Sequence, residues 1–301
     1  MNTNPAEKRA LTKKELIGKI DYWRKYARSY MLLFAVLLVL WGTLFAVIDS
    51  MILLLVLIFG SLFALEGIFS LLWRRKFGST IADMDESDLR SQIIREALKE
   101  GFQFVRFDPK GEMPRESLPL PWLTFTKGCS TYIGSNYASG QSVSTPVEAE
   151  QAVFGYLKTY TETTDQPHSY STYQQLEERF NGMLYRFHLD RAFPAVTLRT
   201  EKQPKKKGET LQFEQRFSVL CNHPEQLSGL LTPGMKQFLT ESAGRIRGRM
   251  YIHFAPTGDV YLAFHQKIYD CTIKKGKVPF QVLETQLQVV NGLIRGLTGG
   301  F

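Results

Sequence analysis

The chain has 301 residues, of which 44% are hydrophobic and 22% are charged, and its formal net charge is +8. The charge is uneven: residues 1–76 hold 11 Lys and Arg against 5 Asp and Glu, whereas residues 77–301 hold 26 against 24. A basic balance confined to one end argues against a nucleic-acid-binding protein. The lysine run 205–207, which no aromatic residue interleaves, is interpreted as a solvated turn.

The first predicted element is an amphipathic cytosolic helix within residues 1–28. Thr12 and Glu15 have the spacing of a capping box, in which each side chain satisfies a free backbone N–H group of the first turn. Apolar residues then recur every three or four positions, which is one face of a helix. This helix either lies among lipid headgroups or extends the next segment into the cytosol, and we adopt the second arrangement.

Residues 29–76 are predicted to form a transmembrane helical hairpin. As one helix, the apolar run from Met31 to Trp73 would be about 65 Å long, twice the hydrocarbon thickness of about 30 Å. It is therefore expected to fold back at Asp49 and Ser50. Cations flank both ends of the run and none lies at the turn, so both termini are predicted to be cytoplasmic, with the lipid bilayer as a partner.

Two features of this hairpin carry further predictions. Gly42, Gly60 and Gly67 belong to small-residue stripes, which are expected to pack the two arms together. Glu66 lies about seven residues inside the cytoplasmic end of the second arm, where an ionised carboxylate is costly. It is expected to be protonated, to reach toward Arg74, or to meet a partner from another chain. Glu66 is the single candidate site residue.

Residues 77–301 are predicted to form a cytosolic α+β domain, with a mainly antiparallel sheet and packed helices. A helix over 85–101 precedes a strand over 102–107. A proline-rich segment follows, and the glycine- and serine-rich stretch 128–145 is interpreted as a loop. The later predictions are a strand, a loop, a helical segment and three strands, at 153–160, 161–172, 173–180, 184–189, 195–200 and 211–220.

The C-terminal third carries the clearest local pattern. Pro224 and Pro233 each suit the first position of a helix, and Thr232 suits the cap of the second. Alternating apolar residues on either side of a turn with proline and glycine predict a β-hairpin, 250–254 with 260–264. The terminal helix, 280–297, has an apolar stripe that fits a coiled coil or packing on its own sheet, and we favour packing.

No catalytic, cofactor-binding or metal-binding residue is predicted. The hairpin register places His253 and His265 about 13 Å apart, too far for one metal ion. Cys221 and His223 are two positions apart on a strand, about 6–7 Å, which is beyond the reach of a nucleophile and its base. A closed zinc site needs four ligands, and no others cluster nearby in sequence. The three cysteines form no CxxC motif and are expected to be reduced.

The C-terminal half resembles a known family. The segments that carry the resemblance are LQFEQRFSV at 211–219, LLTP at 230–233, MYIHF at 250–254 and VYLAF at 260–264. In this order they resemble the signature of a bacterial membrane family named as domain of unknown function number 3137, over about residues 124–270. The resemblance implies bacterial origin and plasma (inner) membrane residence, and no activity. The family usually has other polar residues at positions 221 and 223.

Three functions remain open on this evidence. The leading hypothesis is a membrane-tethered cytosolic domain that binds a protein partner or assembles into a homo-oligomer without catalysis. The alternative is an enzyme or small-ligand sensor whose site is assembled from residues far apart in sequence. The third is a transport or channel component built around Glu66.

Overall fold

The computed structural model describes residues 12–45, 51–77, 86–120, 123–163, 170–201, 212–246, 248–266 and 278–299. The chain divides into two compact units. The first comprises Met1–Ile93 with Tyr269–Pro279, and the second comprises Ile94–Ile268 with Phe280–Phe301. The predicted turn at Asp49 and Ser50, the lysine run 205–207 and Cys271 lie outside the described residues.

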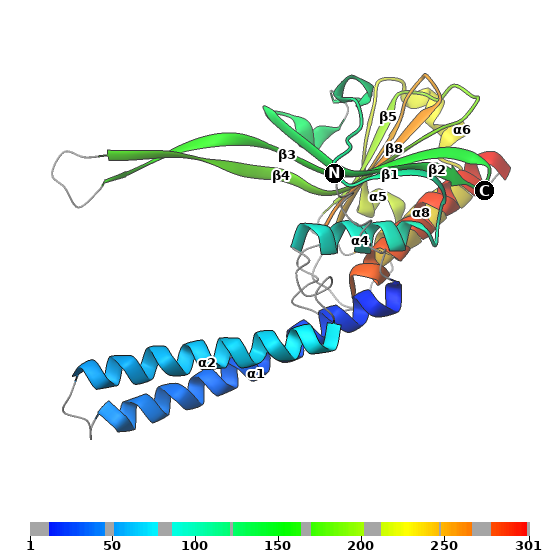
Figure 1. Ribbon diagram of the computed structural model, residues 1–301. Helices are drawn as coiled ribbons and strands as arrows, with labels where there is room; N and C mark the ends of the chain where they lie inside the picture. Colours follow the sequence, from blue (N-terminus) through cyan, green and yellow to red (C-terminus); the bar gives the residue numbers. More distant parts are fainter. Residues whose placement is uncertain are drawn as a thin grey trace, which may run out of the picture. The chain divides into compact units, whose positions relative to one another are not determined.

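The first unit contains two long helices, α1 (Lys13–Phe45) and α2 (Met51–Phe77), which lie side by side (Figure 1). The capping box at the start of α1 is confirmed. The Thr12 backbone N–H donates to Glu15 Oε2 at 2.8 Å, and the Glu15 N–H donates to Thr12 Oγ1 at 3.4 Å. Helix α4 (Glu86–Leu98) begins in this unit and matches the helix predicted over 85–101.

The prediction of a transmembrane hairpin over residues 29–76 is wrong. Among the residues that the structure describes, no helix is both long enough and apolar enough to cross a membrane. The predicted inner-membrane localisation rested on that hairpin and is corrected with it.

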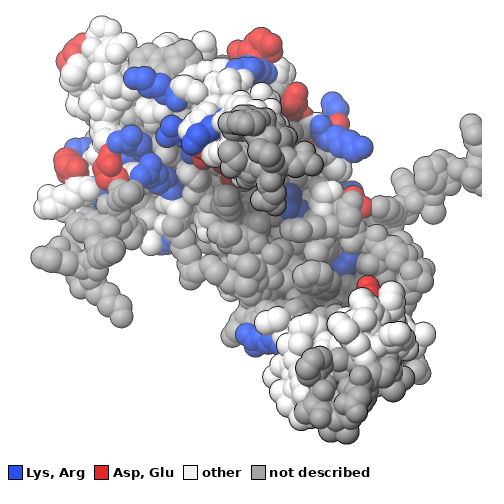
Figure 2. Space-filling view, turned by 90° about the vertical axis from the view of Figure 1, so that its left-hand side faces the viewer, with Lys and Arg blue, Asp and Glu red and all other residues white. Residues whose placement is uncertain are grey.

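Apolar side chains nevertheless lie exposed along α1 and α2. Met31, Ile52 and Phe63 are 72%, 77% and 73% exposed. In the view of Figure 2, the described surface at the lower right, which belongs to this pair, is almost free of charged side chains. A Cβ atom added at Gly42, Gly60 or Gly67 would meet nothing within 4 Å. Among the described residues nothing packs against these glycines, and their packing of the two arms together stays a prediction.

The second unit is built on an antiparallel sheet of eight strands in the order β1-β2-β3-β4-β8-β7-β5-β6. Every pair of neighbours is antiparallel, as expected for the sheet of an α+β domain. The strands are β1 (Gln103–Asp108), β2 (Thr131–Ser142), β3 (Thr145–Thr163), β4 (Tyr170–His188), β5 (Val196–Thr200), β6 (Phe217–Cys221), β7 (Arg249–Phe254) and β8 (Asp259–His265).

One face of this sheet, here the helix-covered face, is packed by α8 (Val278–Gly299) and α7 (Pro233–Arg245) (Figure 1). The Tyr185 hydroxyl of β4 donates to Gln286 Oε1 of α8 at 3.2 Å. A Cβ at Gly292 of α8 would lie 2.6 Å from the Phe238 ring of α7, so only glycine permits this approach. The terminal helix packs on its own sheet as predicted, and Thr232 caps α7 by accepting from the Met235 N–H at 3.2 Å.

The opposite face, here the loop-covered face, lies under residues 109–120 and 123–130. This cover contains two short 3-10 helices, η1 (Arg115–Ser117) and η2 (Thr124–Thr126). From η2 the Phe125 ring stacks on Phe180 at 4.2 Å and meets Tyr251 edge-on at 4.8 Å. The fully buried Met113 and Leu123 complete a core that fixes the cover to the sheet.

Three local predictions differ from the structure. The stretch interpreted as a loop, 128–145, contains β2, whose backbone pairs with β1 and β3 on its two sides. The described ends of the predicted loop, 161–163 and 170–172, belong to β3 and β4, and residues 164–169 lie outside the described residues. The predicted helical segment at 173–180 belongs to β4. The strand at 211–220 begins only at Phe217, after the helical turn α5 (Phe213–Arg216). In each case pairing between strands or contacts distant in sequence outweigh local propensity.

Other predictions are confirmed. Strands β1 and β5 match 102–107 and 195–200, and β4 includes 184–189. The β7–β8 hairpin has the expected register, with His253 opposite Tyr261 and His265 opposite Arg249. Pro224 begins η3 (Pro224–Gln226), which leads into α6 (Leu227–Leu230).

Candidate functional site

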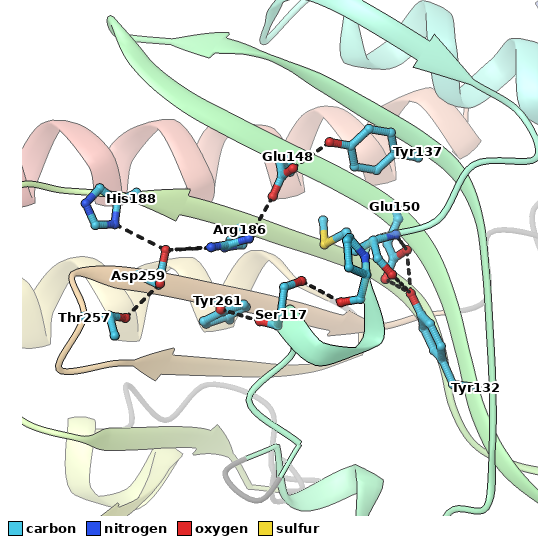
Figure 3. A network of polar contacts seen from close by, with 12 residues as sticks. Ser117, Tyr132, Tyr137, Glu148, Glu150, Arg186, His188, Thr257, Asp259 and Tyr261 are labelled. Atoms are coloured by element: carbon cyan, nitrogen blue, oxygen red, sulfur yellow. Dashed lines mark hydrogen bonds and ion pairs between the residues drawn. The ribbon is translucent and has the colours of Figure 1, made fainter.

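The loop-covered face carries a row of polar side chains across its central strands. Successive side chains of a strand point to opposite faces, so the register decides which residues meet. Glu148 of β3 lies opposite Arg186 of β4, and Arg186 lies opposite Tyr261 of β8. His188 lies opposite Asp259 in the same way. The sheet thus gathers strand residues separated by up to 124 positions, from Tyr137 to Tyr261, into one network (Figure 3).

Arg186 stands at the centre of this network. Its Nη1 lies 3.3 Å from Glu148 Oε2, and its Nη2 lies 3.3 Å from Asp259 Oδ1. Its guanidinium also lies over the Tyr261 ring, 5.8 Å from the centroid. The hydroxyl of Tyr137 donates to Glu148 Oε1 at 2.6 Å. Burial and this hydrogen bond raise the pKa of Tyr137 to about 12, so the hydroxyl keeps its proton.

Asp259 closes the network at the turn of the β7–β8 hairpin. The Thr257 hydroxyl donates to its Oδ2 at 2.8 Å, and His188 Nδ1 lies 3.3 Å from its Oδ1. The neighbouring Tyr261 hydroxyl donates to the backbone carbonyl of Ser117 at 2.7 Å, which ties the cover to the sheet. The network therefore connects four strands, β2, β3, β4 and β8, and the cover through groups that already satisfy one another.

Glu150 is the most deeply buried carboxyl group of this face, with no exposed surface. Its Oε2 accepts the Met113 backbone N–H at 2.8 Å, and the Tyr132 hydroxyl lies 2.7 and 2.8 Å from its two oxygens. Burial raises the pKa of Glu150 to about 7, although the two hydrogen bonds act in the opposite direction. Glu150 is thus a carboxyl group that titrates near neutral pH and holds the cover in place.

Gly134 makes room for this arrangement. A Cβ atom there would lie 2.8 Å from both Glu150 Oε2 and the Tyr132 hydroxyl, and 2.4 Å from Glu112 Cβ. Any larger residue would displace the carboxylate from Tyr132.

His253 lies on the same face, further along β7, and is 1% exposed. Its Nδ1 lies 3.0 Å from the Thr197 hydroxyl of β5. Burial lowers the pKa of His253 to about 4, so its ring is neutral at neutral pH. His265 is half-buried and packs against the Phe180 ring at 5.4 Å. The two histidines belong to different surroundings, in agreement with their predicted separation.

A pocket of about 560 Å³ opens beside the cover. Two cationic side chains, three threonines and a cysteine line it together with apolar residues: Arg115, Leu120, Thr124, Thr126, Lys127, Cys129, Thr131, Phe154 and Leu220. Burial raises the pKa of the Cys129 thiol, which disfavours the reactive thiolate. The pocket suits binding better than covalent chemistry.

The residues singled out from sequence are not brought together. Glu66 lies on α2, exposed to solvent, with no ion pair among the residues described. The His223 N–H donates to Cys221 Sγ at 3.3 Å, while its ring lies 3.2 Å from Glu225. Across the described ranges, no group of three or more His, Cys, Asp and Glu side chains is placed to hold a metal.

Sequence reasoning missed the residues that form the network. Glu148 and Glu150 alternate with the apolar Val147 and Ala149, which is a period-two signal for a strand that begins earlier than the predicted 153. That alternation is the signal in the sequence from which a strand through Glu148 and Glu150 can be predicted. Arg186, Tyr132 and Asp259 carry no such local signal, because only the strand order brings them close.

No family model and no curated protein matches the chain. The solved structure of the mycobacterial trehalose monomycolate transport factor A, TtfA, is similar at 12% identity with a TM-score of 0.36. The similarity covers 68% of this chain and 94% of that chain. The resemblance to the family of domain of unknown function number 3137 stays a prediction.

Proposed function

We propose that this chain is a non-catalytic assembly protein, and that its α1–α2 helical pair docks against the same pair of a second copy. The observation that supports this is the apolar surface of the pair. Leu32, Val39, Val56 and Leu71 are each at least 61% exposed, besides Met31, Ile52 and Phe63. Exposed apolar surface of this kind marks an interaction site, because water disfavours it.

The open glycines support helix-to-helix docking. Glycine inside a helix costs about 0.5–1 kcal/mol relative to alanine. Within the described residues nothing crowds Gly42, Gly60 or Gly67, so no contact there requires glycine. A docked helix would require it, because side-chain ridges of one helix fit into the grooves that small residues leave on another.

A second copy is the occupant that fits this surface. The described part of the pair combines large exposed side chains, such as Phe59 and Phe63, with glycines that no described atom crowds. Such a surface can be complementary to itself, as a two-fold symmetric interface requires. The scarcity of charge on it means that two copies do not repel each other.

The polar network supports a non-catalytic interpretation. Glu148, Arg186 and Asp259 bind one another, and Tyr261 binds the cover. Groups satisfied in this way stabilise the fold and leave little capacity for substrate.

The test is the mass of the purified full chain by sedimentation velocity, for the wild type and for Gly60→Leu with Gly67→Leu. An added Cβ atom at either position meets no described atom within 4 Å, so we expect the fold to be retained while close approach of a second helix is blocked. The matched control is Gly18→Leu, at an equally open glycine outside the apolar stretch. We expect the wild type and the control to assemble and the double variant to dissociate. A monomeric wild type, or a double variant that assembles like the control, would contradict the proposal.

A further inference from the structure

We propose that the pocket on the loop-covered face binds a small amphipathic anion, with an acidic head group and an apolar body the size of a medium-chain fatty acid. The site lies entirely within the second unit, and its occupation does not depend on assembly.

The first observation is the charge around the pocket. Arg115 and Lys127 line it, both are exposed, and neither has an ion-pair partner among the residues described. Arg179 lies close enough to Cys129 for its charge to act on the thiol. No acidic side chain lines the pocket. Two lining cations, with Arg179 near Cys129, and no lining carboxylate favour an anionic ligand.

The second observation is the set of hydroxyl groups. The Thr126 hydroxyl is occupied, since it lies 2.6 Å from the Leu120 carbonyl and 2.7 Å from the Leu123 carbonyl, both of which can accept its proton. Thr124 and Thr131 have no side-chain hydrogen bond within the described part of the chain. These two hydroxyls are available as donors to the oxygens of a carboxylate or phosphate head group.

The third observation is the apolar wall. Leu120, Phe154 and Leu220 line the pocket, and the Cys129 thiol donates to the Phe125 carbonyl at 3.4 Å, which leaves its sulfur as a soft apolar surface. Ligand pockets are mostly apolar with a few placed polar groups, and span about 300–1,000 Å³. The volume of about 560 Å³ falls in this range.

The pocket is also pre-formed. Its cover is fixed by the Met113 N–H on Glu150 at 2.8 Å, by Tyr261 on the Ser117 carbonyl at 2.7 Å and by the stacking of Phe125 on Phe180. A site that is already ordered loses little conformational entropy when the ligand binds.

The experiment is calorimetric titration of the full-length chain with decanoate, 1-decanol and decylamine, which share a chain length and differ in head-group charge. The variant is Arg115→Gln with Lys127→Gln. The control is Lys110→Gln with Arg295→Gln, which removes the same charge from exposed positions that do not line the pocket. Non-specific binding to exposed apolar surface is the same in both, so the difference between them reports the pocket.

We expect saturable decanoate binding that weakens roughly tenfold or more in the pocket variant and is unchanged in the control. The alcohol and the amine should bind at least tenfold more weakly than decanoate. A second variant, Leu220→Trp, narrows the pocket at a half-exposed position, and should weaken decanoate binding with the charges intact. Equal affinity for the three ligands, no saturable binding, or a pocket variant that binds like its control would overturn the proposal.

Discussion

The β3–β4 hairpin passes through two environments, and their difference shows what stabilises this sheet. Up to Gly155, β3 pairs with β2, and from Met183 onward β4 pairs with β8. Beyond these limits the two strands pair only with each other among the described residues, as a ribbon that projects from the sheet (Figure 1). Phe154 in the sheet is 2% exposed, whereas Leu157, three residues on, is 53% exposed.

The sheet is therefore stabilised by contacts distant in sequence, and the ribbon by cross-strand pairs. In the ribbon, Tyr160 stacks on Tyr173 at 5.5 Å, and Glu177 accepts from Tyr160 at 2.7 Å and from Lys158 at 2.9 Å. An isolated two-stranded ribbon is only marginally stable in water. Substitutions in the two regions should differ sharply in their effect on unfolding.

The largest difference is expected for Phe180→Ala compared with Tyr173→Ala. Phe180 has no exposed surface and packs against three aromatic rings of the loop-covered core. Its loss should lower the free energy of unfolding by about 3–5 kcal/mol, through lost burial and the cavity left behind. Tyr173, 43% exposed in the ribbon, should cost less than about 1 kcal/mol. Urea unfolding measures both, and similar losses would contradict the division into two regions.

Glu150→Gln tests the carboxyl group that fastens the cover. Its pKa rises from 4.5 to about 7 on folding, so the folded state binds the proton more tightly than the unfolded state. Its contribution to stability is complete below pH 4.5 and is lost as the pH rises to 7, by about 3 kcal/mol in total. The variant, which mimics the protonated form, should match the wild type at pH 5 and exceed it at pH 8. The control is the exposed Glu116→Gln, and equal pH profiles in wild type and Glu150→Gln would contradict this role.

His253→Gln should act with the opposite sign. The pKa of His253 falls from 6.5 to about 4 on folding, so the unfolded state binds the proton more tightly. Its contribution is complete above pH 6.5 and is lost as the pH falls toward 4, by up to about 3 kcal/mol. In the wild type the two groups oppose each other between pH 4.5 and 6.5. The stability of His253→Gln should fall with rising pH in this window, and a profile parallel to the wild type would be evidence against the effect.

The strands of this sheet also show which parts of the fold can be predicted from the sequence. The β7–β8 hairpin and its register were predicted correctly, because alternation and a turn with Pro256 and Gly258 lie within 15 residues of each other. Strand β2 was missed, since its glycines and serines suit a loop until β1 and β3 supply hydrogen bonds on both sides. At Asn136 the backbone even takes a φ of 56°, within an irregularity of the ladder. Local propensity cannot report pairing of this kind.

The candidate site depended still more on the fold. Glu150 meets the Met113 N–H across 37 positions, and Tyr261 meets the Ser117 carbonyl across 144. The pocket is lined by residues of η1, η2, β2, β3 and β6, which no spacing in the sequence connects. The apolar run correctly predicts the helices α1 and α2. The prediction that they form a membrane hairpin is wrong, because no described helix is long and apolar enough to cross a membrane.

The smallest effect on unfolding is expected in the ribbon itself, for Glu177→Gln. The hydroxyls of Tyr156 and Tyr160 and the amine of Lys158 donate to this carboxylate, and the pKa of Glu177 is lowered to about 2. Because the ribbon adds little to the core, the urea midpoint of the variant should equal that of the wild type. Local opening should become more frequent, since a neutral amide cannot accept from three donors as well as a carboxylate does. Cleavage within 155–178 by limiting protease should therefore be several-fold faster than in the wild type. The control Glu225→Gln, in η3 and outside the ribbon, should be cleaved like the wild type. If Glu177→Gln were cleaved more slowly, or if its urea midpoint shifted as far as that of Phe180→Ala, the ribbon and the sheet would unfold as one unit. Either result would contradict the division into two regions.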